Sequence, residues 1–320
     1  MSRRLLTLLA LLAVLVLVWG VGGRFLANDL SGEAPAVEAA EQQLVRHAQG
    51  ETAVPLHPAR VGVFDLGALD ILDALGVDAY GVAGDDFPEY LARYRDARYV
   101  RLGTLFEPDY EAVHRAAPDL VITGGRSSAR YAPLAQMVPT IDMPADDAHP
   151  VAQTLANLQL LAKVFDREAR AQALAIEVTE AVEALRAKTA DRGRGLIVLV
   201  SGGKLSAYGP GSRFGVLHTD FGVPVAAEGL TVSLHGEAIG SEFILKTNPD
   251  WLFVIDRDAA IGQAGAARQV LDNPLVRQTT AWRTGQVMYL EPVNWYLVGG
   301  GVQALQAMIR QVDEGYERAR

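Results

Sequence analysis

Cysteine is absent from this 320-residue chain, and aromatic residues make up only 7% of it. The lack of cysteine excludes disulfides, thiolate metal sites, iron–sulfur clusters and lipid attachment through an N-terminal cysteine. Common catalytic motifs are missing too, because the chain has no Gly-x-Ser-x-Gly, His-Glu-x-x-His or Gly-x-x-x-x-Gly-Lys-Ser/Thr. Its six histidines include no i, i+4 pair, so a closed multi-histidine metal cage is not expected.

Basic residues are the minority among the charges. Lys and Arg total 29 against 38 Asp and Glu, which gives a formal net charge of −9. This balance argues against nucleic-acid binding, because a phosphate backbone requires a basic surface. A small anionic ligand held in a local basic pocket remains possible. Half of the residues are hydrophobic, so a globally disordered chain is excluded.

An apolar run, residues 5–18, follows Arg3 and Arg4 at the N-terminus. A basic start and an apolar segment are typical of a secretory signal. We expect export, with residues 1–23 as a signal peptide or, since the run approaches the ~20 residues that span a bilayer, an uncleaved membrane anchor. Residues 24–53 are predicted to be a tether, with some helix at 37–48 and a short strand at 52–55.

Two α/β lobes are predicted, over residues 54–150 and 191–320. Short apolar strands alternate with helical stretches in each, which is typical of largely parallel, Rossmann-like sheets. The strands are expected at 61–64, 79–82, 120–123, 140–143, 196–200, 252–255 and 286–290, and the helices at 69–75, 111–117, 127–137, 241–246, 266–271 and 302–312.

The segment between the lobes, residues 151–190, contains neither Gly nor Pro. Two helices fit it, with a break near residues 165–166 and Asp166 as the cap of the second. A helix over residues 167–189 would be a rod of roughly 35 Å. A rod of this length is a rigid spacer, since a flexible hinge would carry Gly, Ser or Pro. This geometry favours a binding protein and does not by itself exclude an enzyme.

One local pattern occurs in both lobes. Glu111 stands seven residues before Pro118, and Glu242 stands seven residues before Pro249, in each case ahead of a buried strand. The pattern indicates two related lobes. The alternative is coincidence, because a helix followed by Pro-Asp and a strand is common in α/β proteins.

Three arginines are candidates for binding an anion. Arg126 and Arg257 each follow a predicted strand, where open α/β sheets bind their ligands, and Arg213 lies in the glycine-rich stretch 208–215. A guanidinium group presents a fixed fork of donors suited to anionic oxygens. The alternative is that each is a surface arginine paired with a nearby acid, most of all Arg257, which two aspartates flank.

Trp295 and Tyr296 lie in a predicted loop before the last helix, and His235 lies in another. The Tyr296 phenol could bind a hard metal ion such as Fe³⁺. Taken singly, core packing is the better explanation of the aromatic pair, and an ordinary exposed or capping histidine is the better explanation of His235.

Taken together, these motifs resemble the catecholate-siderophore binding proteins of ABC importers, and within them the enterochelin/petrobactin type. The resemblance covers about residues 54–311, with the motifs in the expected order. The motifs are residues 64–70, 103–109, 124–126, 205–215, 235–236, 254–260 and 295–297.

The resemblance implies the fold of a helical-backbone periplasmic binding protein, in which a long rigid helix bridges two α/β lobes. It also implies that Arg126, Arg213 and Arg257 form a basic triad in the interlobe cleft, with Tyr208 and Trp295 contributing to ligand binding.

Further roles are implied for other residues. His235 and Tyr296 match positions that bind the iron when the siderophore is tetradentate. Glu111 and Glu242 match acids that dock each lobe onto a membrane permease.

The expected function is therefore capture of a ferric catecholate siderophore and its delivery to the permease dimer of an ABC importer in the inner membrane. No reaction is expected, and Fe³⁺ would arrive with the siderophore rather than as a permanent cofactor. We expect a periplasmic monomer, either free or held by its N-terminal helix, since no cysteine is available for acylation. The alternatives are a haem or cobalamin binding protein of the same fold and a metal-dependent hydrolase.

Overall fold

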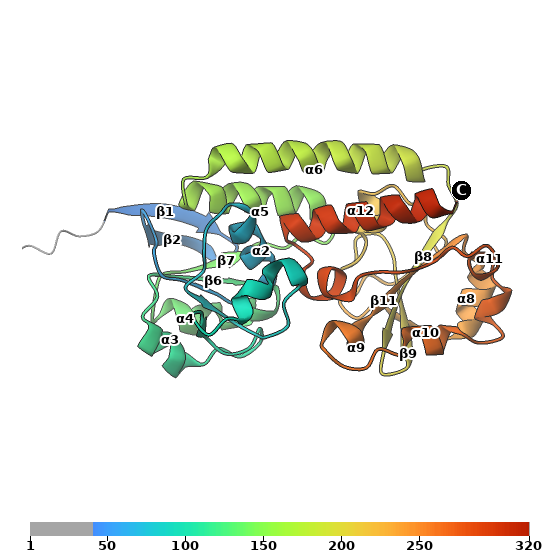
Figure 1. Ribbon diagram of the computed structural model, residues 1–320, viewed down its shortest axis with the longest axis horizontal. Helices are drawn as coiled ribbons and strands as arrows, with labels where there is room; N and C mark the ends of the chain where they lie inside the picture. The colour runs from blue at the N-terminus through green and yellow to red at the C-terminus, as the bar shows by residue number, and fades with distance from the viewer. Residues whose placement is uncertain (1–40, 320) are drawn as a thin grey trace, which may run out of the picture. The chain divides into compact units, whose positions relative to one another are not determined.

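The computed structural model describes residues 41–319 (Figure 1). The predicted signal or anchor at 1–23, and the predicted tether up to residue 40, lie outside the described residues. Within the described part of the chain, no helix is both long enough and apolar enough to cross a membrane.

A β-hairpin opens the described chain. β1 (Gln42–His47) pairs antiparallel with β2 (Gly50–Pro55), so the strand predicted at 52–55 is confirmed and the helix predicted over 37–48 is wrong for residues 42–47. Val45 and His47 face inward while Leu44 is exposed, which is the two-residue alternation of a strand. The folded unit thus begins near residue 41, ahead of the lobe boundary expected at residue 54.

The N-terminal lobe contains a five-stranded parallel sheet in the order β5-β4-β3-β6-β7. Its strands are β3 (Val61–Val63), β4 (Gly81–Val82), β5 (Val100–Arg101), β6 (Leu120–Gly124) and β7 (Thr140–Met143). Its helices are α2 (Leu66–Ala74), η1 (Glu89–Arg95), α3 (Tyr110–Ala116), η2 (Gly125–Arg130) and α4 (Tyr131–Ala135).

The C-terminal lobe has a sheet in the order β10-β9-β8-β11-β12. Strands β8, β11 and β12 pair parallel, and β9 pairs antiparallel with both of its neighbours, β8 and β10. The strands are β8 (Gly195–Ser201), β9 (Lys204–Tyr208), β10 (Glu237–Ile239), β11 (Trp251–Asp256) and β12 (Val287–Tyr289). The helices are α7 (Val216–Thr219), α8 (Ser241–Thr247), α9 (Arg257–Ala260), α10 (Ala267–Leu271), η3 (Val276–Gln278), α11 (Thr280–Arg283) and η4 (Val293–Val298).

The two lobes share a structural feature at the repeated Pro-Asp. Asp119 accepts a hydrogen bond from the Arg60 amide at 3.0 Å, and Asp250 accepts one from the Arg194 amide at 2.8 Å. Each amide directly precedes the central strand of its sheet. In both lobes the preceding helix ends on a residue with a left-handed φ, 42° in one and 43° in the other. These matching details support the interpretation that the lobes are related.

Three helices form a layer across both sheets (Figure 1). They are α5 (Pro150–Val164), α6 (Glu168–Thr189) and α12 (Val302–Arg318). The two predicted bridging helices are therefore confirmed, but the cap predicted at Asp166 is wrong. Arg167 occupies the N-cap of α6, whereas Asp166 takes a left-handed φ of 54° and its carboxylate lies 3.2 Å from His57.

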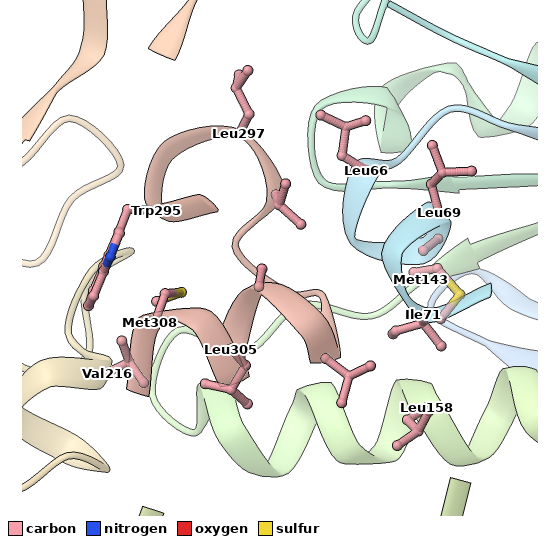
Figure 2. Close-up of a cluster of buried hydrophobic side chains, with 14 of the residues drawn as sticks. Leu66, Leu69, Ile71, Met143, Leu158, Val216, Trp295, Leu297, Leu305 and Met308 are labelled. Carbon is pink, nitrogen blue, oxygen red and sulfur yellow. The ribbon is translucent and has the colours of Figure 1, made fainter. Parts of the chain in front are cut away.

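A large cluster of buried apolar side chains spans both lobes, and each lobe also has a smaller apolar cluster of its own. Figure 2 shows part of this large cluster, with Leu69 of α2, Leu158 of α5 and Leu305 and Met308 of α12, and with Trp295 of the C-terminal lobe near Met308. Because close-packed side chains join the lobes over this area, their relative position is set by packing rather than by a thin hinge.

Candidate functional site

Three arginines from separate parts of the chain meet at Tyr296. Arg126 donates to the Tyr296 carbonyl at 2.6 Å and to the Leu297 carbonyl at 3.0 Å. Arg213 also donates to the Tyr296 carbonyl, and Arg257 Nε donates to the Tyr296 hydroxyl at 3.0 Å. The structure therefore brings the three arginines predicted from sequence into one cluster, with Tyr296 at its centre.

The ends of two strands place two of these arginines. Arg126 lies in η2, directly after β6, and Arg257 is the first residue of α9, directly after β11. Arg213 comes from the loop that follows β9. Arg257 also lies 3.6 Å from Asp258, so the ion pair considered from sequence exists alongside the contact with Tyr296.

The guanidinium groups also surround the aromatic ring of Tyr296. Their central carbons lie 4.3 Å (Arg213), 5.5 Å (Arg126) and 5.8 Å (Arg257) from the ring centroid. A cation over an aromatic face is attracted by the ring's negative face. This attraction lets three like charges gather around one half-buried side chain.

The charges of the arginines shift the pKa values of Arg126 and Tyr296. Burial lowers the pKa of the Arg126 guanidinium, and the positive charge of Arg213 lowers it further. Burial alone would raise the pKa of Tyr296, but the hydrogen bond from Arg257 and the charge of Arg213 outweigh it and hold that pKa below its usual value. The site therefore favours a phenolate, a hard anionic oxygen donor, more than an isolated tyrosine does.

Aromatic rings support Tyr296 from the C-terminal lobe. Phe214 lies 6.5 Å from it between ring centroids, and Tyr208 packs edge-on against Phe214 at 4.7 Å. Tyr208 is 2% exposed, and burial raises the pKa of its phenol. Phe214 was not singled out from sequence, although its place directly after Arg213 was a usable signal.

The segment that carries Trp295 and Tyr296 is a π-helix, η4, and the loop predicted there is wrong. Single π turns are frequent at functional sites. The turn directs the two neighbours differently, since Tyr296 is half-buried among the arginines while Trp295 is 2% exposed. The Trp295 indole donates to Gln311 at 3.0 Å and packs edge-on against Phe221. Trp295 thus supports Tyr296 from the core, and direct contact with a ligand stays a prediction.

His235 is exposed in the loop before β10. Its neighbour Gly236 has a φ of 69° and lies so close to Tyr208 that a side chain there would meet the tyrosine ring at 2.8 Å. The loop is therefore held against the aromatic part of the cluster, with the imidazole outside the core. Among residues 41–319, no group of three or more His, Asp or Glu side chains forms a metal site by itself.

A cavity of about 210 Å³ lies beside the cluster, between the lobes. Arg126, Arg213 and Tyr296 line it together with residues of α2, α5 and α12. Asp65 also lines it; burial raises the pKa of this carboxyl, while a hydrogen bond from the Ala68 amide and the charge of Arg126 oppose the rise. Sequence reasoning did not single out Asp65, although it caps α2 within one of the quoted motifs.

Glu111 and Glu242 lie apart from this cluster, one on each lobe. Each occupies the first turn of a short helix, α3 and α8, and each is exposed. The Glu111 side chain is 90% exposed and lies 3.5 Å from Arg115.

The chain matches known proteins along most of its length. The family model described as "Periplasmic binding protein" matches residues 62–293. The petrobactin-binding protein YclQ of Bacillus subtilis is 37% identical over 87% of this chain and 89% of its own. The ferric-anguibactin-binding protein FatB of Vibrio anguillarum is 31% identical over 86% of this chain and 87% of its own.

Solved structures agree with this fold. The crystal structure of YclQ matches with a TM-score of 0.84 at 36% identity, covering 87% of this chain and 99% of that one. The periplasmic catecholate-siderophore binding protein VctP of Vibrio cholerae matches with a TM-score of 0.81 at 33% identity, covering 86% and 100%. The predicted α/β binding-protein fold is confirmed, as is the expectation of a binding protein rather than an enzyme. This chain belongs to the periplasmic binding protein family.

Proposed function

We propose that this protein binds a ferric catecholate siderophore between its lobes and delivers it to an ABC importer for iron uptake. The observation that carries the proposal is the convergence of Arg126, Arg213 and Arg257 on Tyr296. The names of the relatives, which include petrobactin-binding, ferric-anguibactin-binding and catecholate-siderophore binding proteins, support the same ligand class.

The charge of the ligand suits the cluster. A ferric ion bound by three catecholates carries three negative charges, and the cluster supplies three guanidinium groups. Hydrogen bonds from arginine to anionic oxygens are about twice as strong as those between neutral groups. In the free protein, backbone carbonyls and the Tyr296 hydroxyl accept some of these donors, and further N–H groups of each arginine remain to bind catecholate oxygens.

Tyr296 and His235 give the site a second mode of binding. A tetradentate bis-catecholate leaves two of the six iron positions open. The Tyr296 phenolate, favoured by its lowered pKa, would fill one and the exposed His235 imidazole the other. Tyr208 and Trp295 would shape the wall behind them. Iron is cargo in this account and enters and leaves with the siderophore.

Delivery requires a surface that the permease recognises. Glu111 and Glu242 are exposed on corresponding helices of the two lobes, which suits one docking contact per lobe with arginines of a permease dimer in the inner membrane. We infer a periplasmic monomer, free or held by its N-terminal segment.

Removing one positive charge at a time tests the proposal. Arg126→Gln, Arg213→Gln and Arg257→Gln should each weaken binding of a ferric tris-catecholate by about tenfold to a hundredfold, because each loses a charge-assisted hydrogen bond to the ligand. Fluorescence titration with the purified variants measures the affinity.

The matched control is Arg277→Gln, which removes the same charge from an exposed arginine paired with Asp272 on the C-terminal lobe. This variant should bind as the unmodified protein does. Unchanged affinity in all three cluster variants would reject the assignment of the arginines.

A further inference from the structure

The start of α12 is capped by a residue from the opposite lobe. The helix's own N-cap, Gly301, has no side chain to offer. Instead Asp70 of α2 accepts hydrogen bonds from the Gln303 amide at 2.8 Å and the Ala304 amide at 2.9 Å. A carboxylate at this place satisfies the free amides of the first turn and favours the positive end of the helix dipole.

Asp70 is fully buried at this contact. The Tyr90 hydroxyl donates to its second oxygen at 2.7 Å, so both carboxylate oxygens are used. The Gln303 side chain donates to the Asp70 carbonyl at 3.2 Å and to Asp73 at 2.8 Å. A buried carboxylate is strongly unfavourable unless it is fully hydrogen-bonded, so this residue depends on the placement of α12 and α12 depends on this residue.

Glycines allow the close approach of the two elements. A methyl group at Gly301 would overlap the Asp70 carboxylate, and one at Gly67 of α2 would lie 3.1 Å from the backbone of Gly300. Contact with the N-terminal lobe therefore explains the glycine at position 301, whereas Gly299 takes a left-handed φ of 58° in the turn that joins η4 to α12. In Figure 2 the start of α12 lies next to α2, between η4 and α5.

Arg126 holds the other end of the same segment. It donates to the carbonyls of Tyr296 and Leu297, while Asp70 accepts from the amides of Gln303 and Ala304. We call these two sets of contacts the clamp. In it, Arg126 and Asp70 of the N-terminal lobe bind the two ends of residues 296–304. A cation meets carbonyls at one end and a carboxylate meets amides at the other, so each end of the segment has a complementary partner.

Resting on the proposed function, we propose that Asp70 is a positioning residue for siderophore binding, which holds Tyr296 in register with the arginines of both lobes. Tyr296 is only five residues ahead of Gly301, and the contacts of Arg126 and Asp70 lie at the two ends of this short stretch. The clamp thus fixes Tyr296, the proposed iron ligand in the C-terminal lobe, relative to the N-terminal lobe.

Loss of the clamp should change how the two lobes are held relative to each other, and this change can be measured without a siderophore. Because the chain has no cysteine, Ala135→Cys on α4 and Gln269→Cys on α10, both exposed, can be spin-labelled specifically. Asp70→Asn keeps the shape of the side chain but turns an amide NH₂ toward one of the donors. The distribution of interlobe distances, measured by double electron–electron resonance, should broaden in this variant.

Asp109→Asn is the matched control, because Asp109 caps α3 within the N-terminal lobe through the Ala112 amide at 2.9 Å. Its distance distribution should match that of the labelled parent. Gly301→Ala tests the clamp from the other side and should broaden the distribution as Asp70→Asn does. A distribution unchanged in both Asp70→Asn and Gly301→Ala would overturn the proposal.

Ligand binding gives the functional readout. Asp70→Asn should weaken a ferric bis-catecholate, which needs Tyr296, by about tenfold, and a ferric tris-catecholate by less than about threefold. A structural defect alone would weaken both equally, and that outcome would reject the positioning role. If the unmodified protein bound neither ligand, the proposed function would fail, while the distance measurement would still decide whether the clamp exists.

Discussion

Tyr296 offers both of its oxygens to arginines, the backbone carbonyl to Arg126 and Arg213 and the hydroxyl to Arg257. The two kinds of contact have different consequences. The carbonyl contacts position the residue, whereas the hydroxyl contact favours the phenolate. A single residue thus links the placement of the site to its chemistry.

Removal of the Tyr296 hydroxyl distinguishes the binding of a bis-catecholate, which needs this group, from that of a tris-catecholate, which does not. Tyr296→Phe should weaken a ferric bis-catecholate by about tenfold or more, because one iron ligand is lost, and should leave a tris-catecholate within about threefold. The visible spectrum of the bis-catecholate complex should change as well, because the phenolate-to-iron contribution is lost while the catecholate-to-iron band remains. Titration followed by visible absorbance measures both effects.

Tyr289→Phe is the control. Tyr289 lies on β12, away from the cluster, and its ring packs against Arg268 of α10. A visible spectrum of the bis-catecholate complex that is the same in Tyr296→Phe as in the unmodified protein would show that this tyrosine does not bind the iron.

Sequence reasoning identified the three arginines and Tyr296 because their side chains carry recognisable chemistry at strand ends or within motifs. It did not identify how they meet, because two of the arginines bind the carbonyl of Tyr296. Every residue has a backbone carbonyl, so the sequence gives no signal for such a contact. Asp70 was missed for a related reason, since its partners are the amides of Gln303 and Ala304.

At the scale of elements, the hairpin of β1 and β2 is joined to the N-terminal lobe through His47. The Nδ1 atom of this buried residue accepts from the amides of Gln49 at 3.2 Å and Asp142 at 3.3 Å. Its Nε2 lies 2.9 Å from the Thr52 hydroxyl. The ring is therefore neutral, with its proton on Nε2. Burial lowers the pKa of His47, and the charge of Asp142 only partly offsets the effect.

This pKa shift predicts that acid weakens the hairpin. A histidine whose pKa is lower in the folded state stabilises the fold above its unfolded pKa of about 6.5. That contribution is lost as the pH falls through the folded pKa, when Nδ1 gains a proton and can no longer accept from the two amides. Hydrogen exchange of amides 42–55 should accelerate, relative to the rest of the protein, between pH 7 and pH 5 after correction for intrinsic rates.

His47→Gln should remove this pH dependence, and His114→Gln, at an exposed position, should retain it. Equal acceleration in the unmodified protein and in His47→Gln would contradict the assignment.

The elements that were predicted correctly have strong local signals. Residues 151–190, which form the bridging helices after Pro150 at the start of α5, lack Gly and Pro, and strands such as β8 and β11 are continuous apolar runs. The first strand of the hairpin, β1, was missed because the Ala- and Glu-rich residues before it suggested a helix, and its alternation is only six residues long. The π-helix η4 has no distinguishing periodicity, so its sequence suggested only a loop.

At the scale of the whole described unit, two structures oppose large movements of the lobes. One is the apolar core that continues from α2 through α5 and α12 (Figure 2). The other is the clamp. We therefore expect the cleft to change little in width on binding, as a rigid bridge in the sequence indicated. The relatedness of the two lobes could be predicted from the repeated Pro-Asp pattern. The clamp could not, since its contact between Asp70 and Gln303 joins residues 233 positions apart in the chain.

The central claim is that the cluster is built for ferric catecholates, and ligand selectivity tests it most directly. The purified protein should be titrated with a ferric tris-catecholate, a ferric bis-catecholate, a ferric hydroxamate and haem, while its tryptophan fluorescence is recorded. Trp295 adjoins Tyr296, so a bound iron complex that absorbs visible light will quench the emission. The account predicts quenching by both catecholates at submicromolar concentration and none by the hydroxamate. Absence of quenching by either catecholate, with quenching by haem instead, would contradict it.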